Sequence, residues 1–211
     1  MKLISAAAAL LLLVSAPGCD RFLVPPREQV YAAWEEGLTL GYEDPSLESG
    51  LRQQRRQQVR VKEARPTAAG LAVTKTFSTL SGRWETRVLQ KDGGVTLMSE
   101  SAAGIRLLPE GFPDRVGRWE SRGAYNWVVG RAWADLPGVR LAEPGQAVGV
   151  WVESTPVDAP GSRTRTLYLP DIGEAQTLTW IGGRWVTTNI LVTRGFTDSP
   201  APSAKTSGST S

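Results

Sequence analysis

Two pairs of carboxylates lie close together in this sequence and could perform acid–base chemistry: Glu110 with Asp114, and Asp171 with Glu174. Glycosidases use two carboxyl groups held at a fixed separation. Acidic pairs of this kind are also common beside turns, and sequence alone does not set their distance. The chain has no histidine and one cysteine, which removes the Ser-His-Asp triad, the Cys-His dyad and the ordinary zinc site. We therefore expect a protein that is not an enzyme, with no catalytic residue, no metal and no cofactor.

The single cysteine, Cys19, follows Lys2 and an apolar stretch from Leu3 to Ala16. At about 14 residues, this stretch is shorter than the ~20 residues of a membrane-spanning helix and has the length of a secretory signal. The residues Ala16-Pro17-Gly18-Cys19 resemble the lipobox of bacterial lipoproteins. The resemblance implies that Cys19 becomes the lipidated first residue, and that Asp20 acts as a sorting signal for the inner membrane. The alternative is an ordinary signal peptidase, which would release a soluble protein with a free thiol.

Charge and lipidation together limit the expected partners. The chain has 24 Lys and Arg residues against 21 Asp and Glu residues, which is too balanced for a nucleic-acid-binding protein. Helical spacing predicts a solvated face for one cluster of arginines: Arg52, Arg55, Arg56 and Arg60. Two acyl chains hold a protein stably on a bilayer. We expect an exported, membrane-anchored protein that faces the periplasm or the cell exterior, and whose partners are the membrane and an envelope protein, a lipid or a glycan.

The eight tryptophans are unusual for this length, and six fall in predicted strands: Trp84, Trp127, Trp133, Trp151, Trp180 and Trp185. Large aromatic side chains bury much area, so we favour packing in the interior of a small barrel. The alternative is a groove for sugars or acyl chains. Tyr125, Trp127 and Trp133 alternate along one predicted strand and would share a face with Val129 and Arg131. These three aromatic residues are the candidate binding residues.

Alternating hydrophobicity dominates from residue 58 onward. Leu71, Val73, Lys75, Phe77 and Thr79 would line one face of a half-buried antiparallel strand. Further strands are predicted at 58–63, 83–90, 94–100, 104–108, 125–134, 147–153, 163–169, 175–180 and 185–193. Turn signals such as Asp92-Gly93-Gly94 and Gly182-Gly183 separate most of them. The sequence predicts a mainly β protein, an antiparallel β-meander that forms a barrel, a half-barrel or a sandwich.

The organisation along the chain follows from these patterns. We assign residues 1–18 to a signal peptide, 19–27 to a lipidated tether, 28–197 to a single β-rich domain and 198–211 to a disordered tail rich in Ser, Thr, Pro and Ala. Val30, Ala33 and Trp34 recur at helical spacing, which predicts one N-terminal helix between Pro26 and Gly37. The tripeptide Gly-Arg-Trp occurs three times, which leaves two related halves as an open alternative.

The run Tyr168-Leu169-Pro170-Asp171-Ile172-Gly173-Glu174 resembles a pattern near the C-terminus of exported bacterial β-meander proteins. The resemblance implies a penultimate hairpin and no active site. Our leading hypothesis is a non-catalytic binding or assembly module of the cell envelope. One alternative resembles the half-barrel lipoprotein carriers, in which a curved sheet and a helix enclose an apolar cavity for lipophilic molecules. Another is a carbohydrate-binding or glycan-cleaving protein.

Overall fold

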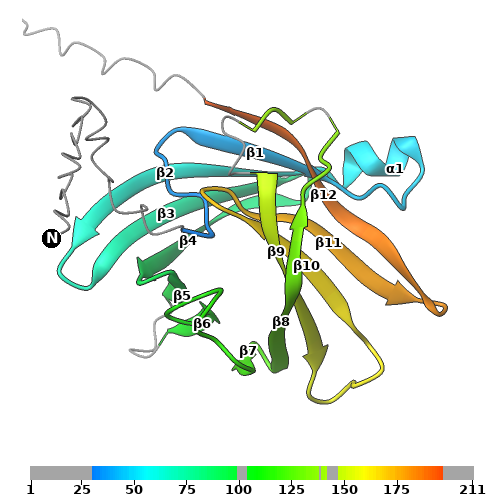
Figure 1. Ribbon diagram of the computed structural model, residues 1–211. Coiled ribbons are helices and arrows are strands. Elements are labelled where there is room, and N and C mark those ends of the chain that lie inside the picture. The colour runs from blue at the N-terminus through cyan, green and yellow to red at the C-terminus, as the bar shows by residue number, and fades with distance from the viewer. Residues whose placement is uncertain (1–29, 99–103, 138, 142–146, 197–211) are drawn as a thin grey trace, which may run out of the picture.

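The computed structural model describes residues 30–98, 104–137, 139–141 and 147–196, and most of them lie in one strongly curved sheet (Figure 1). The sheet is an antiparallel meander that nearly closes into a barrel, which confirms the predicted fold class. The proposed signal peptide, the tether with Cys19 and Asp20, and the tail from residue 198 lie outside the described residues.

Twelve strands are present among the described residues. In chain order they are β1 Leu38–Glu43, β2 Gln57–Thr67, β3 Gly70–Thr79, β4 Gly82–Lys91, β5 Gly94–Met98, β6 Ile105–Leu108, β7 Trp119–Ser121, β8 Ala124–Trp133, β9 Val148–Pro156, β10 Thr164–Leu169, β11 Gly173–Ile181 and β12 Arg184–Phe196. All ten predicted strands are found. The sequence did not predict β1, which follows the predicted helix, or the three-residue β7.

The strand order is β6-β5-β4-β3-β2-β1-β12-β11-β10-β9-β8-β7, so two six-stranded meanders are joined where β1 pairs with β12. A common origin of the two halves stays a prediction. The edge strands β6 and β7 come together at the seam of the barrel, at the lower side of Figure 1. There the indole nitrogen of Trp119 donates a hydrogen bond to the main-chain oxygen of Leu107, at 3.2 Å. A side chain therefore bridges the seam.

The predicted N-terminal helix is wrong, because residues 30–37 contain no helix. Three consecutive residues of this segment, Tyr31, Ala32 and Ala33, are buried, whereas an amphipathic helix would bury one face only. The segment is held by Asp171, whose main-chain nitrogen donates to the oxygen of Val30 at 2.6 Å. Contacts with residues far away in the sequence therefore take the place of hydrogen bonds within a helix.

One short helix, α1 (Ser49–Gln54), connects β1 to β2 and has no buried residue. It contains Arg52, whose guanidinium donates to the main-chain oxygen of Leu47, and the following Arg56 lies 3.5 Å from the carboxylate of Glu43. The arginine cluster is thus solvated, as predicted, although Arg60 belongs to β2. Within the described residues, no helix has the length and apolar character needed to cross a membrane.

The inner face of the sheet follows from the strand registers. Val59 pairs with Phe77, and Val61 pairs with Lys75. Directly paired residues of antiparallel strands lie on the same face, so the apolar side chains of β2, β3 and β4 form a continuous wall. Val61 and Val73 are each 1% exposed. The predicted inward face of β3 is therefore confirmed, and Lys75 lies on it.

Candidate functional site

The curved sheet leaves an interior cavity of about 300 Å³. One wall is the inner face of β2 to β6, and the opposite wall contains the N-terminal segment at 31–33 and the turn that joins β10 to β11. The volume is at the lower end of the ~300–1,000 Å³ range of small-molecule sites. The cavity is the candidate functional site of this protein.

Most of the sheet wall is apolar. The alternating pattern of each strand delivers one or two side chains to the cavity, and these include Val59, Phe77, Val88 and Leu97. The ring of Phe77 stacks on the indole of Trp84, with centroids 5.6 Å apart and planes at 6°. Trp84 is 45% exposed, so this stacked pair connects the cavity wall to solvent.

Polar side chains gather on the remaining lining. Tyr42 from β1 donates its hydroxyl to the main-chain oxygen of Glu174 at 2.8 Å, and the hydroxyl of Tyr168 lies 3.5 Å from the Glu174 carboxylate. Burial, together with the negative charge of Glu174, raises the pKa of both phenols, while Arg122 has the opposite effect on Tyr168. Both tyrosines are therefore neutral hydrogen-bonding groups at neutral pH.

Lys75 is the cationic residue on the apolar wall. Burial lowers the pKa of Lys75 to about 8, and the carboxylate of Glu174 acts in the opposite direction. Within the described part of the chain, the Lys75 ammonium has neither a hydrogen bond nor an ion pair. Lys75 is half-buried, and an ammonium that loses part of its water without gaining a partner is costly to bury. The cavity therefore holds an unmatched cation.

Aromatic rings and hydrogen bonds to Asp171 hold the N-terminal segment against the far wall of the cavity. The ring of Phe112 lies 5.1 Å from the ring of Tyr31 and 6.0 Å from that of Tyr168, both in edge-to-face geometry. The indole nitrogen of Trp34 donates to the carboxylate of Asp171 at 2.8 Å. These contacts order a segment that has no regular secondary structure of its own.

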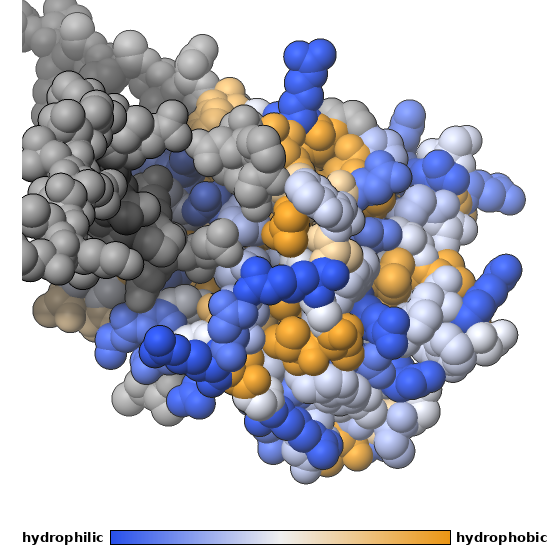
Figure 2. Space-filling model, viewed as in Figure 1, coloured by the Kyte–Doolittle hydropathy of each residue, from blue (hydrophilic) through white to orange (hydrophobic). Residues whose placement is uncertain are grey.

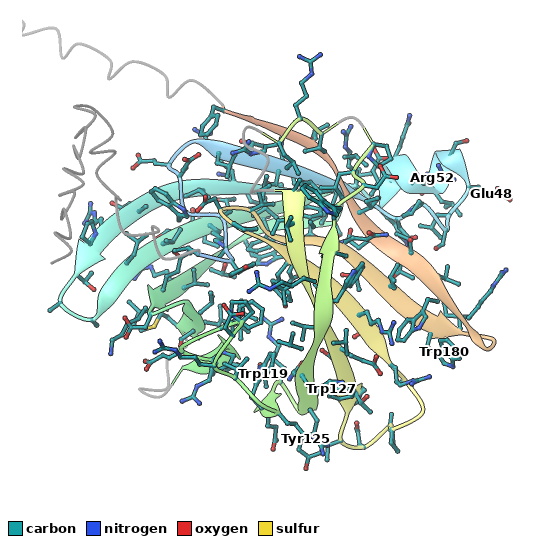
Figure 3. The ribbon with its side chains drawn as sticks, viewed as in Figure 1. Glu48, Arg52, Trp119, Tyr125, Trp127 and Trp180 are labelled. Carbon is teal, nitrogen blue, oxygen red and sulfur yellow. The ribbon has the colours of Figure 1, made fainter. Side chains whose placement is uncertain are left out.

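The three candidate binding residues do not share a face, which corrects the prediction from alternation. Tyr125 and Trp127 pair with residues of β9 on one face, but a β-bulge between Val128 and Gly130 shifts the register. Because one extra residue reverses the alternation, Trp133 lies on the opposite face, where it is 71% exposed. Figure 3 shows Tyr125 and Trp127 together near one end of β8. A single aromatic strip on β8 therefore does not exist.

The six strand tryptophans do not fill the interior as predicted, although Trp151 packs against the core. None of the six belongs to the buried core, and among the tryptophans it is Trp119 that is buried, at 9% exposure. The bulky rings sit at strand ends and on the outer face, while valine, leucine and tyrosine fill the core. Figure 2 shows that apolar groups on the viewed surface are separated by charged side chains.

Two of the outer tryptophans take part in an ionic cluster on one face of β9 to β12. Glu153, only 4% exposed, contacts Arg165 at 2.8 Å and Arg163 at 3.5 Å. The guanidinium of Arg163 lies over Trp180, and that of Arg165 over Trp185, at 4.8 and 4.4 Å. The two indoles meet at 65°, so they do not form the flat platform that stacks on a sugar ring. Figure 3 places Trp180 near the far end of β11.

The carboxylate pairs have structural contacts. Asp114 forms an ion pair with Arg131, and Glu110 lies 3.8 Å from the ammonium of Lys91. Asp171 holds Trp34, and Glu174 lines the cavity. Among the described residues, no group of acidic residues, histidines or cysteines is arranged to hold a metal ion.

Lys75 is the functional candidate that the sequence reading missed. A signal was present, because Lys75 interrupts the apolar series of Leu71, Val73 and Phe77 on the inward face of β3. A charged side chain at such a position is either exposed at the end of the sheet or buried at a functional site. The sequence does not distinguish these cases, since the strand partners and the opposite wall decide them.

Comparisons with family models and with curated protein sequences gave no match. Two solved structures resemble the fold. One is described as an exported protein with a YmcC-like fold from Bacteroides fragilis, with 13% identity and a TM-score of 0.45, and the similarity covers 79% of this chain and 99% of that one. The other is described as a lipoprotein from Parabacteroides distasonis, with 11% identity and a TM-score of 0.46, covering 80% and 100%. The function therefore has to be argued from the cavity itself.

Proposed function

We propose that this protein is an exported lipoprotein that binds a small, mostly apolar molecule inside its curved sheet, as a carrier or receptor in the cell envelope. The observation that carries the proposal is the cavity of about 300 Å³, whose sheet wall is built from inward-facing aliphatic and aromatic side chains. A protein that served only as an assembly module would need no such space, because filling it would add stability. A ligand that displaces water from this wall would gain hydrophobic free energy.

The alternative of glycan binding has less support. Sugar rings stack on exposed, flat aromatic surfaces, but Trp180 and Trp185 meet at 65° and are covered by arginines. Tyr125 is covered in the same way, because the guanidinium of Arg118 lies 3.8 Å from its ring centre. The rings of Tyr125, Trp180 and Trp185 therefore already have cationic partners within the chain.

The binding proposal is tested by filling the cavity from one side. Leu97 lines the cavity, whereas the next residue, Met98, is 47% exposed and lies on the opposite face. We expect Leu97→Trp to reduce the fluorescence of the bound apolar dye N-phenylnaphthylamine at least tenfold, while Met98→Trp binds the dye as the wild type does. Equal dye binding by all three proteins would refute the cavity as the binding site. Circular dichroism and thermal unfolding of each variant would establish that it is folded.

The membrane anchor is tested separately by mass spectrometry of the N-terminus. Lipidation predicts a mature protein that begins at Cys19 and carries a diacylglyceryl group. In the Cys19→Ser variant, the protein should move from the membrane fraction to the soluble exported fraction. An unmodified Cys19 in the wild-type protein would refute the anchor and would leave the binding proposal standing.

A further inference from the structure

We infer that the ligand of the cavity is an amphiphile with a single anionic group, such as a carboxylate, and that Lys75 binds this group while the apolar wall binds the chain. The inference rests on the proposed function and identifies the class of ligand.

The lining has an excess of positive charge. Lys75 and Arg122 contribute two cations, and Glu174 contributes one carboxylate. The lining tyrosines Tyr42 and Tyr168 are neutral, because burial raises the pKa of their phenols. Two cations against one anion leave a net charge of +1 on the lining; Lys75 is the half-buried member of the three, whereas Arg122 and Glu174 are exposed. An anionic ligand would neutralise this charge, whereas a cationic ligand would double it.

The position of Lys75 decides which part of the ligand it meets. On the inner face, Lys75 of β3 has Val61 as its neighbour on β2 and Thr86 as its neighbour on β4. The neighbouring positions of β3 on this face are Val73 and Phe77, so the ammonium projects from a mostly apolar wall. A ligand that reaches this ammonium must lie along apolar side chains. A small inorganic anion would leave those side chains without a partner, so an anion with an apolar chain fits the site better.

Polar groups lie on the part of the lining opposite the apolar wall. Tyr168 and Glu174 enter from the side of β10 and β11, and Tyr42 enters from β1, next to Leu40 on the same inner face. A carboxylate accepts hydrogen bonds only, so it suits the Lys75 ammonium as a donor, while the hydroxyls of Tyr42 and Tyr168 already face Glu174. Glu174 would repel a second negative charge, which favours a ligand with one charge over a dianionic ligand.

The test compares three probes with the same eight-carbon chain: octanoate, octanol and octylamine. Isothermal titration of the wild-type protein at pH 7 should give octanoate the highest affinity, at least tenfold above octanol, with octylamine the weakest. In Lys75→Met, octanoate should lose at least tenfold in affinity while octanol keeps or gains affinity. The control is Lys62→Met, which makes the same change at an exposed lysine paired with Glu85 on the outer face.

The pH dependence supplies a second test that needs no variant. As pH rises from 7 to 9.5, Lys75 loses its proton, because its pKa is about 8. Over this range Tyr42 and Tyr168 stay neutral, and arginine keeps its charge. Octanoate affinity should therefore fall, by up to about tenfold per pH unit above the pKa, while octanol affinity stays constant.

The outcomes separate the two proposals. If none of the three probes binds, the proposed binding function fails. If octanol and octylamine bind as well as octanoate, or if Lys75→Met leaves the order of affinities unchanged, the cavity binds ligands but the role of Lys75 is refuted. If Lys75→Met does not fold, an octanoate affinity that is constant between pH 7 and 9.5 refutes that role in the wild-type protein.

Discussion

Replacing Lys75 by methionine should make the folded protein more stable, because the change removes a charge that the fold buries without a partner. Burial lowers the pKa of Lys75 from 10.5 to about 8. A lowering of this size corresponds to an upper limit of about 3.5 kcal/mol, at ~1.4 kcal/mol for each pKa unit. Lys75 keeps some access to solvent, so screening reduces the cost to about 1–3 kcal/mol. Methionine has a similar length and no charge, and it fills apolar space readily.

The sign of the effect depends on pH. Below pH 8, Lys75 is protonated in both the folded and the unfolded chain, and the full cost is present. Between pH 8 and 10.5 the unfolded chain binds more protons than the folded one, so the free energy of unfolding of the wild type rises with pH. The advantage of Lys75→Met should therefore be largest at pH 7 and should vanish near pH 10.5.

Urea denaturation of the wild type and of Lys75→Met at pH 7, 8.5 and 10 measures this difference. The raised pKa values of Tyr31, Tyr42 and Tyr168 destabilise the folded chain at high pH, but they act equally on both proteins and cancel in the comparison. Lys62→Met, at an exposed position, should change the stability by less than about 0.5 kcal/mol at every pH. A difference between wild type and Lys75→Met that is zero or independent of pH would refute the buried-charge reasoning.

Three further substitutions test the packing around the site, each by urea denaturation. Gly149→Ala should lower the free energy of unfolding by about 1–3 kcal/mol, because the new Cβ would lie 2.5 Å from the side chain of Leu167. Gly161 has open space around it, so Gly161→Ala should change the free energy of unfolding by less than ~0.5 kcal/mol. Equal effects of the two substitutions would contradict the crowding at position 149. Glu153→Ala should cost about 2–4 kcal/mol, since it leaves two arginines without their buried partner; a neutral result would mean that solvent already screens the cluster. Asp171→Ala should lower the free energy of unfolding by about 1–2 kcal/mol, because it removes the acceptor of the hydrogen bond from Trp34. Asp171→Asn keeps an acceptor at this position and should lower the free energy of unfolding by less. The reverse order would show that the hydrogen bond does not contribute to stability.

Local patterns in the sequence were sufficient for the sheet. Hydrophobic alternation and turn residues are local properties, and antiparallel hairpins need only neighbouring segments to pair, so ten of the strands could be located in advance. The same alternation placed Lys75 on the inward face with Val73 and Phe77. Alternation failed where one residue was inserted, because the bulge after Val128 reverses every later side chain of β8 and separates Trp127 from Trp133.

Helical spacing misled at the N-terminus for a related reason. Val30, Ala33 and Trp34 have the period of a helix, but Tyr31 to Ala33 are buried together because the turn at Asp171 and the ring of Phe112 cover the segment. Those partners are about 80 to 140 residues away in the sequence, and no local pattern reports them. The strand that follows this segment, β1, was not predicted.

The sequence by itself determined a chain of amphipathic strands with one lysine among the inward side chains of β3, and it predicts an export signal with a lipidation candidate at Cys19. Tertiary structure alone decided that a cavity remains between the inward faces of β2 to β6 and the opposite wall, and that Tyr42, Tyr168 and Glu174 lie together on its lining. It also decided that, among the described residues, no acidic side chain lies close enough to Lys75 to form an ion pair. The physical reason is that a strand's pattern fixes which way each side chain points, whereas the space in front of that side chain depends on segments far away in the chain.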